Sequence, residues 1–598
     1  LRAKNGEISI SDAIDPHLEL VVENKRDEGF TGQKLSDIWQ YFRLTWSSAY
    51  ENTPGRTIRY LIRDYAHPLH AVMGIASLEN CTVQITSRDD YLGWTLTGFV
   101  KRIETETEDG KRLAFLKLLD YLQSGIDGID YSELCNQSVI DHPTKEDVAQ
   151  LAIIAIDAEE KRKALLRSDD YEEEETERSD LGKISKDAEK ALYRKKRAEQ
   201  LAKYLSAKIV IQEFLSLGSI DERSIDFCNS DTGSTAIYTA LVSQKSKHIG
   251  SSMMELNVCG AVPPYNHILG GKLVALLATS PQVIHDYKER YANKPSEIAS
   301  RMKGSPVARP ADLVYVGTTS LYYVGSSQYN RLKIPGSVFG RDYDVVWKRL
   351  GNTFGYGTMH ISRTTTMCLS EAVGEDSKLI NHVFGEGASP KFRLLTMGVS
   401  RLLESAPDAD PKEFTKHAMQ RIVYGACLAK NTKEYLLGYD DEPVYYTDVS
   451  EYQSGTQKII DFWRDRWLLS RLEFEPVFDR IREFDKSELL VSNEFHEDES
   501  VLFEELKEGT PMPTTGKREK LDFVRGFYRG TSAFAEHIPA DLLSIIHVET
   551  KLDDAIRANL SQGKDIVLTG NAGDGKTHII KILEPDLMAT GKNPSIML

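Results

Sequence analysis

The residues best suited to chemistry lie near the end of the 598-residue chain, in the stretch "DIVLTGNAGDGKTHII". Its glycines, lysine and threonine have the G-x-x-x-x-G-K-[ST] spacing of a phosphate-binding loop, whose backbone N–H groups surround phosphate oxygens. Lys576 would reach the β- and γ-phosphates of a nucleotide, and the Thr577 hydroxyl would ligate Mg²⁺. We therefore expect ATP or GTP with Mg²⁺ to bind at Gly570, Asn571, Ala572, Gly573, Asp574, Gly575, Lys576 and Thr577.

The flanks of this loop are those of a P-loop domain. A strand-like "DIVLT" precedes it and "HIIKIL" can begin a helix, but the chain ends at Leu598. Because such a domain normally runs for about 150 residues, we expect residues 546–598 to be the start of a truncated P-loop NTPase domain. The parent protein is then expected to be an ATPase, with the residues that activate water lying beyond Leu598. A structural Gly-rich turn is the alternative, and whether this chain is itself an enzyme stays open.

A second candidate site is the stretch "PPYNHILGGKLVALLA", which runs from a strand end through two glycines into a helix. Gly270, Gly271 and Lys272 would lie at the start of that helix, where free backbone N–H groups can receive an anion such as phosphate. The alternative is a tight strand-to-helix connection that binds nothing.

Two polar stretches rich in Gly and Tyr, Gly317–Gly336 and Arg349–Thr366, form a third candidate. Polar side chains that follow a strand are where α/β proteins usually place ligand sites. His360 could act as a general base, and Arg331 or Arg363 could pair with a phosphate or carboxylate. The cluster also holds Ser326, Ser327, Gln328, Tyr329, Asn330, Tyr356, Thr358 and Ser362. Hydrogen-bonded turns over a sheet edge are the alternative interpretation.

A fourth polar group occurs in "TVQITSRDDYLGWT", where Arg88 stands beside Asp89 and Asp90. We expect a buried ion pair that locks a turn there, rather than a binding site. The sequence contains no HExxH motif and no nucleophile elbow, and its spacing singles out no pair of catalytic carboxylates.

The elements that must position these residues are those of an α/β (α+β) protein with a mixed sheet. Within residues 217–485, strands are predicted at Ser252–Val262 and Ala311–Tyr322. A pair of helices interrupted near Pro281 is predicted for Gly271–Ala292, and a helical segment for Asp410–Gly438. We interpret this region as the α/β core.

The other segments differ in composition. Residues 1–146 contain helical spacing at Leu35–Tyr50 and a strand-like run at His67–Leu78. Residues 147–216 are rich in helix-forming residues and predict a charged insertion of two helices around an acidic joint near Asp169–Asp180. The basic run Arg194–Arg197 on the second helix is interpreted as a solvated face, with a nucleic-acid contact as the alternative. Residues 486–545 are interpreted as a linker and helical connector.

Composition narrows the class of protein. The formal charge of −16 argues against a globally basic nucleic-acid binder, although a local basic groove remains compatible with it. Six cysteines without CxxC spacing suggest neither a zinc site nor a disulfide framework, and the apolar runs are too short for a membrane span. We expect a cytoplasmic protein without membrane contact. Because the first residue is Leu rather than Met, we also expect this chain to be a fragment of a longer one.

Three Gly-containing blocks carry a resemblance to a known family. "HPLHAVMGIASLENCTVQITSRDDYLGWT", "VCGAVPPYNHILGGKLVALLATSP" and "VGTTSLYYVGSSQYNRLKIP" occur in this order, followed by "LGNTFGYGTMHIS". Together they resemble the DruA family of the Druantia anti-phage defence system, over roughly residues 35 to 480. The resemblance implies a role in bacterial immunity, with other defence-system proteins as partners, including a large helicase-like protein. The charged insertion and the added phosphate loop depart from the short members of that family.

Part of the chain also resembles, more faintly, an acetyltransferase of the GNAT fold. In that fold a strand ends in a Gly loop that takes the coenzyme A pyrophosphate, and here His267–Lys272 would be that loop. It departs from the usual pattern at His267, where Gln or Arg is expected, and at Lys272, where a small residue is expected. The resemblance implies acyl-coenzyme A as an alternative cofactor.

Three hypotheses follow. The first is a defence protein in which a DruA-like module is coupled to an ATP-binding P-loop domain and acts on phage nucleic acid or a defence partner, with oligomers formed through the ATPase domain. The second is a GNAT-like acyl-coenzyme A transferase that modifies nucleic acid or protein. The third is a scaffold that nucleotide binding switches without catalysis.

Overall fold

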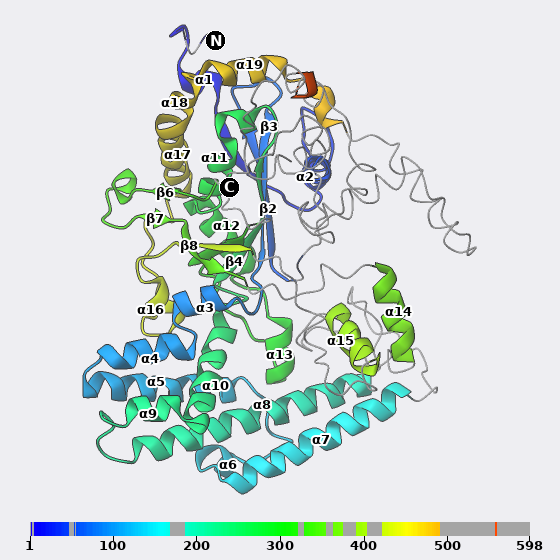
Figure 1. The fold of residues 1–598 in the computed structure, drawn as a ribbon, viewed down its shortest axis with the longest axis vertical. Coiled ribbons are helices and arrows are strands. Elements are labelled where there is room, and N and C mark those ends of the chain that lie inside the picture. Colours follow the sequence, from blue (N-terminus) through cyan, green and yellow to red (C-terminus); the bar gives the residue numbers. More distant parts are fainter. Residues whose placement is uncertain are drawn as a thin grey trace.

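The computed structural model describes residues 2, 5–46, 53, 55–167, 186–320, 328–353, 363–374, 390–402, 421–490 and 556–558. The predicted phosphate loop, most of the predicted linker and nearly all of residues 546–598 lie outside these ranges. The described part combines one seven-stranded sheet with helices on both of its faces and a layer of helices at one end (Figure 1). The fold class predicted from the sequence, α/β with a mixed sheet, is therefore confirmed.

The sheet is antiparallel except at one pair of strands. Its spatial order is β1-β2-β3-β4-β5-β9-β8, and only β4 and β5 run parallel. The strands are β1 (Pro16–Leu20), β2 (Thr57–Asp64), β3 (Ala71–Asn80), β4 (Met253–Ala261), β5 (Tyr315–Thr319), β8 (Lys348–Asn352) and β9 (Ile422–Cys427). A separate two-stranded ribbon pairs β6 (Lys333–Ile334) with β7 (Val345–Val346). The strands predicted within Ser252–Val262 and Ala311–Tyr322 correspond to β4 and β5 and are confirmed.

Successive side chains of a strand point to opposite faces of the sheet, so each strand contributes to two different apolar layers. On one face Tyr60 and Ile62 of β2 pack into a cluster with the helices α11 (Gly270–Leu277), α12 (Pro281–Tyr291) and α17 (Tyr452–Trp463). On the other face Leu61 packs with Trp39 of α2 (Leu35–Leu44), on the opposite side of the sheet in Figure 1. Ser280 caps the first turn of α12, and Pro281 begins it, which confirms the predicted interruption between the two helices.

A layer of helices is inserted between β3 and β4 and lies below the sheet in Figure 1. It comprises α3 (Thr86–Leu92), α4 (Leu96–Thr105), α5 (Glu108–Asp127), α6 (Gln137–Asp141), α7 (Lys145–Arg167), α8 (Lys186–Leu215), α9 (Ser224–Asn229) and α10 (Asp231–His248). Its core is a separate cluster of buried residues in which the Phe115 ring makes edge or tilted contacts with the rings of Phe99, Phe214 and Phe227. The predicted pair of helices in residues 147–216 is confirmed as α7 and α8, which pack along each other.

The basic run on α8 makes intramolecular contacts. Arg194 pairs with Glu133 at 3.4 Å, Lys195 with Glu159 at 3.1 Å, and Arg197 with Asp130 at 3.3 Å. These pairs support the interpretation of the run as part of a charged protein surface rather than a nucleic-acid contact.

The remaining elements surround the sheet. They are α1 (Ile10–Ala13), α13 (Glu297–Lys303), α14 (Arg363–Val373), α15 (Pro390–Leu402), α16 (Thr432–Leu436), α18 (Leu469–Leu472) and α19 (Glu475–Glu483). A π-helical turn, η5 (Arg464–Leu468), joins α17 to α18. In the described ranges, no helix has both the length and the apolar character needed to cross a membrane.

The helical prediction for Asp410–Gly438 was wrong where the structure describes it. Residues Ile422–Cys427 form β9, an internal strand between β5 and β8, and only Thr432–Leu436 are helical. The run "IVYGAC" is apolar throughout, so its spacing fits a helix as well as a strand buried on both faces. Pairing with the two neighbouring strands decides between them.

Candidate functional site where strands four and five separate

The parallel strands β4 and β5 pair over only three residues each. Met253, Met254 and Glu255 face Tyr315, Val316 and Gly317, and no pairing follows. Beyond that point the Thr318 hydroxyl donates to the carbonyl of Leu256 at 2.8 Å. The Gln328 amide donates to the carbonyl of Cys259 at 3.3 Å. Side chains therefore bind carbonyl groups of β4 beyond the point where β5, which continues to Thr319, separates from it.

The connection from β4 to α11 is tightly packed. A Cβ atom on Gly270 would lie 2.7 Å from the carbonyl oxygen of Tyr265 and 2.8 Å from the Cβ of Ala261, so only glycine fits there. Leu269, just before the helix, has a positive φ of 61°. This geometry supports the interpretation of Gly270 and Gly271 as a close strand-to-helix connection, and anion binding at this point stays a prediction.

Lys272 connects two of the sequence-predicted sites. Its Nζ donates to the carbonyls of Gln328 at 3.2 Å and Asn330 at 3.3 Å, and lies 5.9 Å from the ring centroid of Trp467. Burial lowers the pKa of the Lys272 ammonium from its usual range. The structure thus brings the start of α11 against the first polar stretch, which the sequence analysis treated as separate.

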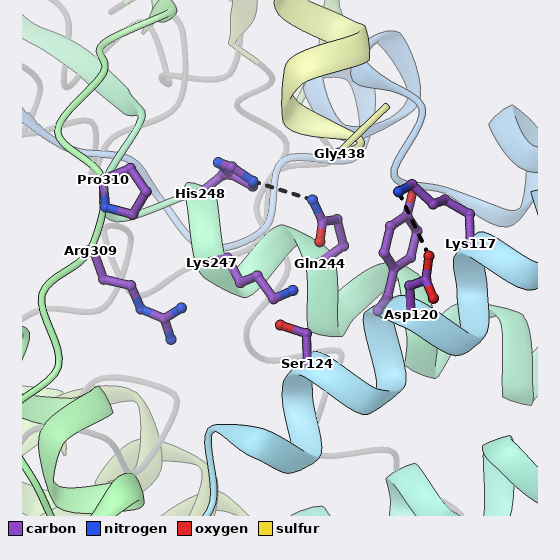
Figure 2. Close-up of a pocket in the computed structure, with 10 residues that line it drawn as sticks. Lys117, Asp120, Ser124, Gln244, Lys247, His248, Arg309, Pro310 and Gly438 are labelled. Carbon is purple, nitrogen blue, oxygen red and sulfur yellow. Dashed lines mark hydrogen bonds and ion pairs between the residues drawn. The ribbon is translucent and has the colours of Figure 1, made fainter. Parts of the chain in front are cut away.

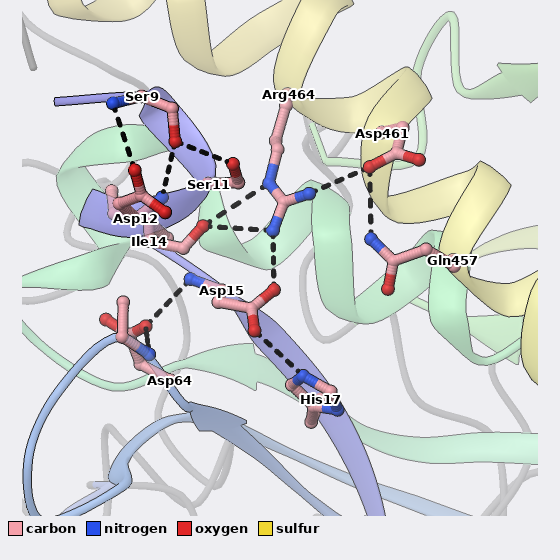
Figure 3. A network of polar contacts seen from close by, with 11 residues as sticks. Ser9, Ser11, Asp12, Ile14, Asp15, His17, Asp64, Gln457, Asp461 and Arg464 are labelled. Atoms are coloured by element: carbon pink, nitrogen blue, oxygen red, sulfur yellow. Dashed lines mark hydrogen bonds and ion pairs between the residues drawn. The ribbon is translucent and has the colours of Figure 1, made fainter.

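Side chains from distant parts of the chain hold the connection from outside. The Tyr265 hydroxyl donates to Asp64 at 3.0 Å, and Asp64 also accepts from the backbone N–H of Asp15 at 2.8 Å (Figure 3). Arg464 of η5 donates to Asp15 at 2.7 Å, and Arg471 of α18 donates to the carbonyl of His267 at 3.0 Å. The connection is consequently fixed by β2, the N-terminal segment and η5–α18 together.

The described part of the predicted polar cluster is mostly structural. Tyr329 is buried, with its ring 5.1 Å from Trp347 and 5.4 Å from Tyr424, and the Tyr424 hydroxyl donates to Asn330 at 3.0 Å. Burial raises the pKa of Tyr329 well above its usual range. Arg331 is exposed and has a positive φ of 58°.

The other candidates of this cluster are not brought together by the described structure. Arg363 begins α14, but its side chain is not described, and His360 lies outside the described ranges. Ser326, Ser327, Tyr356, Thr358 and Ser362 also lie outside them. Their predicted role in binding or catalysis stays a prediction.

Two buried carboxylates, which sequence reasoning missed, lie beside this site. Glu79 of β3 and Glu255 of β4 are register partners, so their side chains share one face of the sheet, opposite α11. Glu79 is fully buried and accepts from Ser77, Asn257 and the backbone N–H of Thr53 at 2.8–2.9 Å. Glu255 accepts from the N–H and hydroxyl of Thr82 at 3.1 and 3.2 Å. A glutamate inside each apolar run, "GIASLEN" and "MMELNV", was the available signal.

On the next two strands, the register partners of these carboxylates are glycines. Gly317 of β5 faces Glu255, and Gly425 of β9 faces Gly317. A Cβ on Gly425 would lie 2.2 Å from the Tyr315 hydroxyl oxygen, so the Tyr315 ring can lie across the strands only because both positions are glycine. A cavity of about 10 Å³ beside Glu255 and Tyr315 has room for roughly one water molecule.

The predicted ion pair in the fourth polar stretch is confirmed. Arg88 donates to Asp89 at 2.7 Å, and the other oxygen of Asp89 accepts from Lys245 of α10 at 2.6 Å. Arg88 and Asp89 are 2% and 4% exposed, so this triad is a buried charge network that joins α3 to α10. Among the described residues, no group of three or more His, Cys, Asp and Glu side chains could hold a metal ion.

Comparisons with known proteins match the segments that form the sheet. Residues 3–115 and 237–438 match the family model described as DruA, Druantia protein DruA. Over 230 residues the chain is 31% identical to the Druantia protein DruA of Escherichia coli (strain UMEA 4076-1), an alignment that covers 38% of this chain and 50% of that protein. The chain therefore matches about half the length of this curated relative. No solved structure matches the chain. The matched segments contain every strand of the seven-stranded sheet and omit α6 to α9.

Proposed function

Because this chain belongs to the DruA family, we propose that it acts in bacterial defence against phage, as part of a Druantia-type system. In the fuller form of the proposal, the sheet module is coupled to ATP binding at residues 570–577 and acts on phage nucleic acid or on a defence partner, such as a helicase-like protein. In this fuller form, a P-loop domain that includes residues 570–577 would hydrolyse ATP.

The proposal rests on where the two segments that match the family model lie in the structure. Both matched segments are needed to complete one sheet, because β1 to β3 come from the first segment and β4, β5, β8 and β9 from the second. The same sheet holds the separation of β4 from β5, the Lys272 contacts and the buried pair Glu79 and Glu255. The module shared with the family is therefore the one that contains the candidate site.

The test of the fuller proposal is phage protection by the intact gene in its gene neighbourhood. We expect Lys576→Ala to raise the efficiency of plating to that of cells without the system, because the variant lacks the ammonium that would contact the β- and γ-phosphates. Lys564→Ala, upstream of the strand-like stretch, is the matched control and should protect like the wild type.

The outcomes separate the parts of the proposal. Full protection by Lys576→Ala would remove the coupling to ATP and leave the defence role intact. Loss of protection in an intact protein that binds ATP without hydrolysing it would support a nucleotide-switched scaffold instead of an ATPase. An intact wild-type system that protects against no phage tested would count against the defence role itself.

A second candidate function, acyl-coenzyme A transfer to nucleic acid or protein, has one observation in its favour. The parallel pair β4 and β5 separates after three residues, and β4 then leads through a glycine-tight connection into the N-terminus of α11. A helix N-terminus of this kind suits the pyrophosphate of coenzyme A.

Acetyl-coenzyme A binding to the whole chain tests this candidate. If it is correct, acetyl-coenzyme A raises the melting temperature of the wild type, and Lys272→Met removes most of that rise. Lys458→Met, on the exposed face of α17, is the control and should keep it. A wild-type melting temperature that does not respond to acetyl-coenzyme A would rule this candidate out.

A further inference from the structure

A cavity among the described residues lies between α5 and α10 of the helical layer and the segment that leads into β5, away from the site described above. Its volume is about 330 Å³, and it is lined by α5, α10, the segment before β5 and the end of α16. The polar side chains that line it are those of Lys117, Asp120, Tyr121, Ser124, Gln244, Lys247, His248 and Arg309. Figure 2 shows Lys247 and Arg309 facing one shared space, with Ser124 across from them on α5.

Two cations in this cavity have no close anionic partner. Neither the Lys247 ammonium nor the Arg309 guanidinium makes a hydrogen bond or ion pair with any residue in the described ranges. Both side chains are partly buried rather than extended into solvent. A partly buried cation is ordinarily paired, because removal from water disfavours its charged form.

The nearby carboxylates do not supply that partner. Asp120 and Asp127 of α5 attract Lys247 electrostatically, but both are exposed. Asp120 pairs with Lys117 at 3.7 Å, and Asp127 accepts from Gln123 at 2.9 Å. The charged side chains that line the cavity are therefore three cations and one carboxylate, an excess of positive charge.

His248 adds no charge to the cavity. The amide nitrogen of Gln244 donates to the carbonyl of Leu436 at 3.1 Å and lies 3.2 Å from Nε2 of His248, so Nε2 accepts. Nδ1 of His248 then carries the proton and donates to the Ser252 hydroxyl at 3.2 Å. Burial, with the nearby charges of Lys247 and Arg309, lowers the pKa of His248 to about 4, so the ring is neutral at physiological pH.

Burial also acts on the two unpaired cations. It lowers the pKa of Lys247 to about 8, with a contribution from the charge of Arg309, and it lowers the pKa of Arg309. Both groups still carry charge at neutral pH. The folded chain thus keeps two positive charges in one hollow without the carboxylate partner that Arg88 and Lys245 share in Asp89.

We propose that this cavity is a binding site for a phosphate-bearing small molecule about the size of a mononucleotide. A guanidinium and an ammonium that face one hollow suit a phosphate group, since arginine contacts two phosphate oxygens at once and lysine supplies a compact charge. The Ser124 hydroxyl can donate a further hydrogen bond. The volume is at the lower end of the roughly 300–1,000 Å³ of small-molecule sites, which fits a ligand of that size. The site is separate from the predicted phosphate loop at residues 570–577.

The test measures binding of pyrophosphate and AMP to the whole chain by calorimetry. All proteins in the test carry Lys576→Ala, so that the predicted phosphate loop does not contribute. The variants are Lys247→Gln and Arg309→Gln, with Lys458→Gln and Arg466→Gln as matched controls at exposed positions of α17 and η5. We expect each cavity variant to weaken binding by about tenfold or more, and each control to stay within about twofold.

A second readout separates binding from folding. Because Lys247→Gln removes one of two like charges, the melting temperature of the unliganded variant should equal or exceed that of its parent. Pyrophosphate should then raise the melting temperature of the parent more than that of the variant.

Three results would overturn the proposal. One is the absence of pyrophosphate and AMP binding in the Lys576→Ala parent, and another is equal binding by the cavity variants and their controls. The third is retention of a single-stranded oligonucleotide without binding of either small probe, which would indicate a nucleic-acid backbone instead.

Discussion

Lys245 and Lys247 lie two residues apart on α10, and their surroundings are opposite in kind. Lys245 reaches Asp89 at 2.6 Å, and Asp89 is held from its other side by Arg88. Lys247 has no ion pair among the described residues and faces the cavity with Arg309. Burial lowers the pKa of both ammonium groups, so both have been partly removed from water.

The difference lies in where each charge is compensated. The chain itself compensates Lys245, and the result is a contact between α3 and α10 that belongs to the fold. Compensation for Lys247 is missing from the described chain, so an external anion is the natural source. A buried charge with partners indicates structure, while one that faces a cavity without partners indicates binding.

The largest effect is expected for Asp89→Asn, which tests whether the buried network of Arg88, Asp89 and Lys245 stabilises the fold. The substitution leaves Arg88 and Lys245 as buried cations without a carboxylate, and we expect a loss of about 3–5 kcal/mol in the free energy of unfolding. Urea denaturation measures it. Asp120→Asn, at an exposed pair with Lys117, is the control and should change stability little. A loss below about 1 kcal/mol for Asp89→Asn would mean that the triad is not the structural contact described here.

The second test concerns His248, the neutral histidine that lines the cavity. His248 has a pKa of about 4 in the folded chain and about 6.5 when unfolded, so only the unfolded state takes up a proton between these values. Its contribution to stability is complete above pH 6.5 and falls by about 3 kcal/mol as the pH drops to 4. Urea denaturation across this range should give a shallower pH dependence for His248→Gln than for the wild type. Identical slopes would contradict the prediction.

A third test extends the comparison to a buried anion. Glu79→Gln places an amide NH₂ among groups that already donate to Glu79, from Ser77, Asn257 and Thr53. Because at least one donor then loses its acceptor, we expect a loss of about 1–3 kcal/mol in the free energy of unfolding. Thermal denaturation measures it, with Glu434→Gln on α16 as a control outside the sheet. An unchanged melting temperature would contradict the prediction.

The fourth test concerns Lys247, the lysine of this comparison that has no ion pair among the described residues. Lys247 has a pKa of about 8 in the folded chain, below its usual 10.5, so wild-type stability should rise between pH 8 and 10.5 as the native ammonium loses its proton first. In Lys247→Gln that rise should be smaller, by about 1 kcal/mol once solvent screening is allowed for. Lys196, whose pKa burial also lowers to about 8, contributes equally to both proteins and cancels. Parallel stability curves would show that Lys247 is not buried as described.

The smallest effect is expected at the basic run of α8. Arg194 is 42% exposed and pairs with an exposed Glu133, so Arg194→Ala should change the free energy of unfolding by less than about 0.5 kcal/mol. Retention of the chain on immobilised DNA should also stay the same. Weaker retention would restore the alternative that this run contacts nucleic acid.

The sequence predicted those elements whose patterns are local. Ser280 followed by Pro281 is a local signal for a helix start, and the helix-forming residues of α7 and α8 need no partner to be recognised. Strand β9 was missed because its apolar run fits either structure, and its neighbours β5 and β8 decide the outcome.

The same limit applies to the sites. The spacing of residues 570–577 is a local signal, and the phosphate loop it indicates stays a prediction. Lys247 and Arg309 come from separate segments that only the fold brings to one cavity. The pair Glu79 and Glu255 was partly visible, as one glutamate in each apolar strand, but their shared face depends on the register of β3 with β4. Lys272 looked like a ligand for an anion, and the structure shows it donating to two backbone carbonyls.

The register of β3 with β4 also bears on the order of folding. Asn80 and Met254 are partners in that pair, although about 170 residues of helical layer separate them along the chain. While those residues are unfolded, bringing the two strands together closes a very long loop, whose entropic penalty no local contact offsets. Once the helices have formed their own core, they hold the two ends close and act as an oversized turn. Folding of the sheet should therefore follow the helical layer, and variants of the Phe115 cluster should slow the pairing of β3 with β4 in hydrogen-exchange refolding experiments.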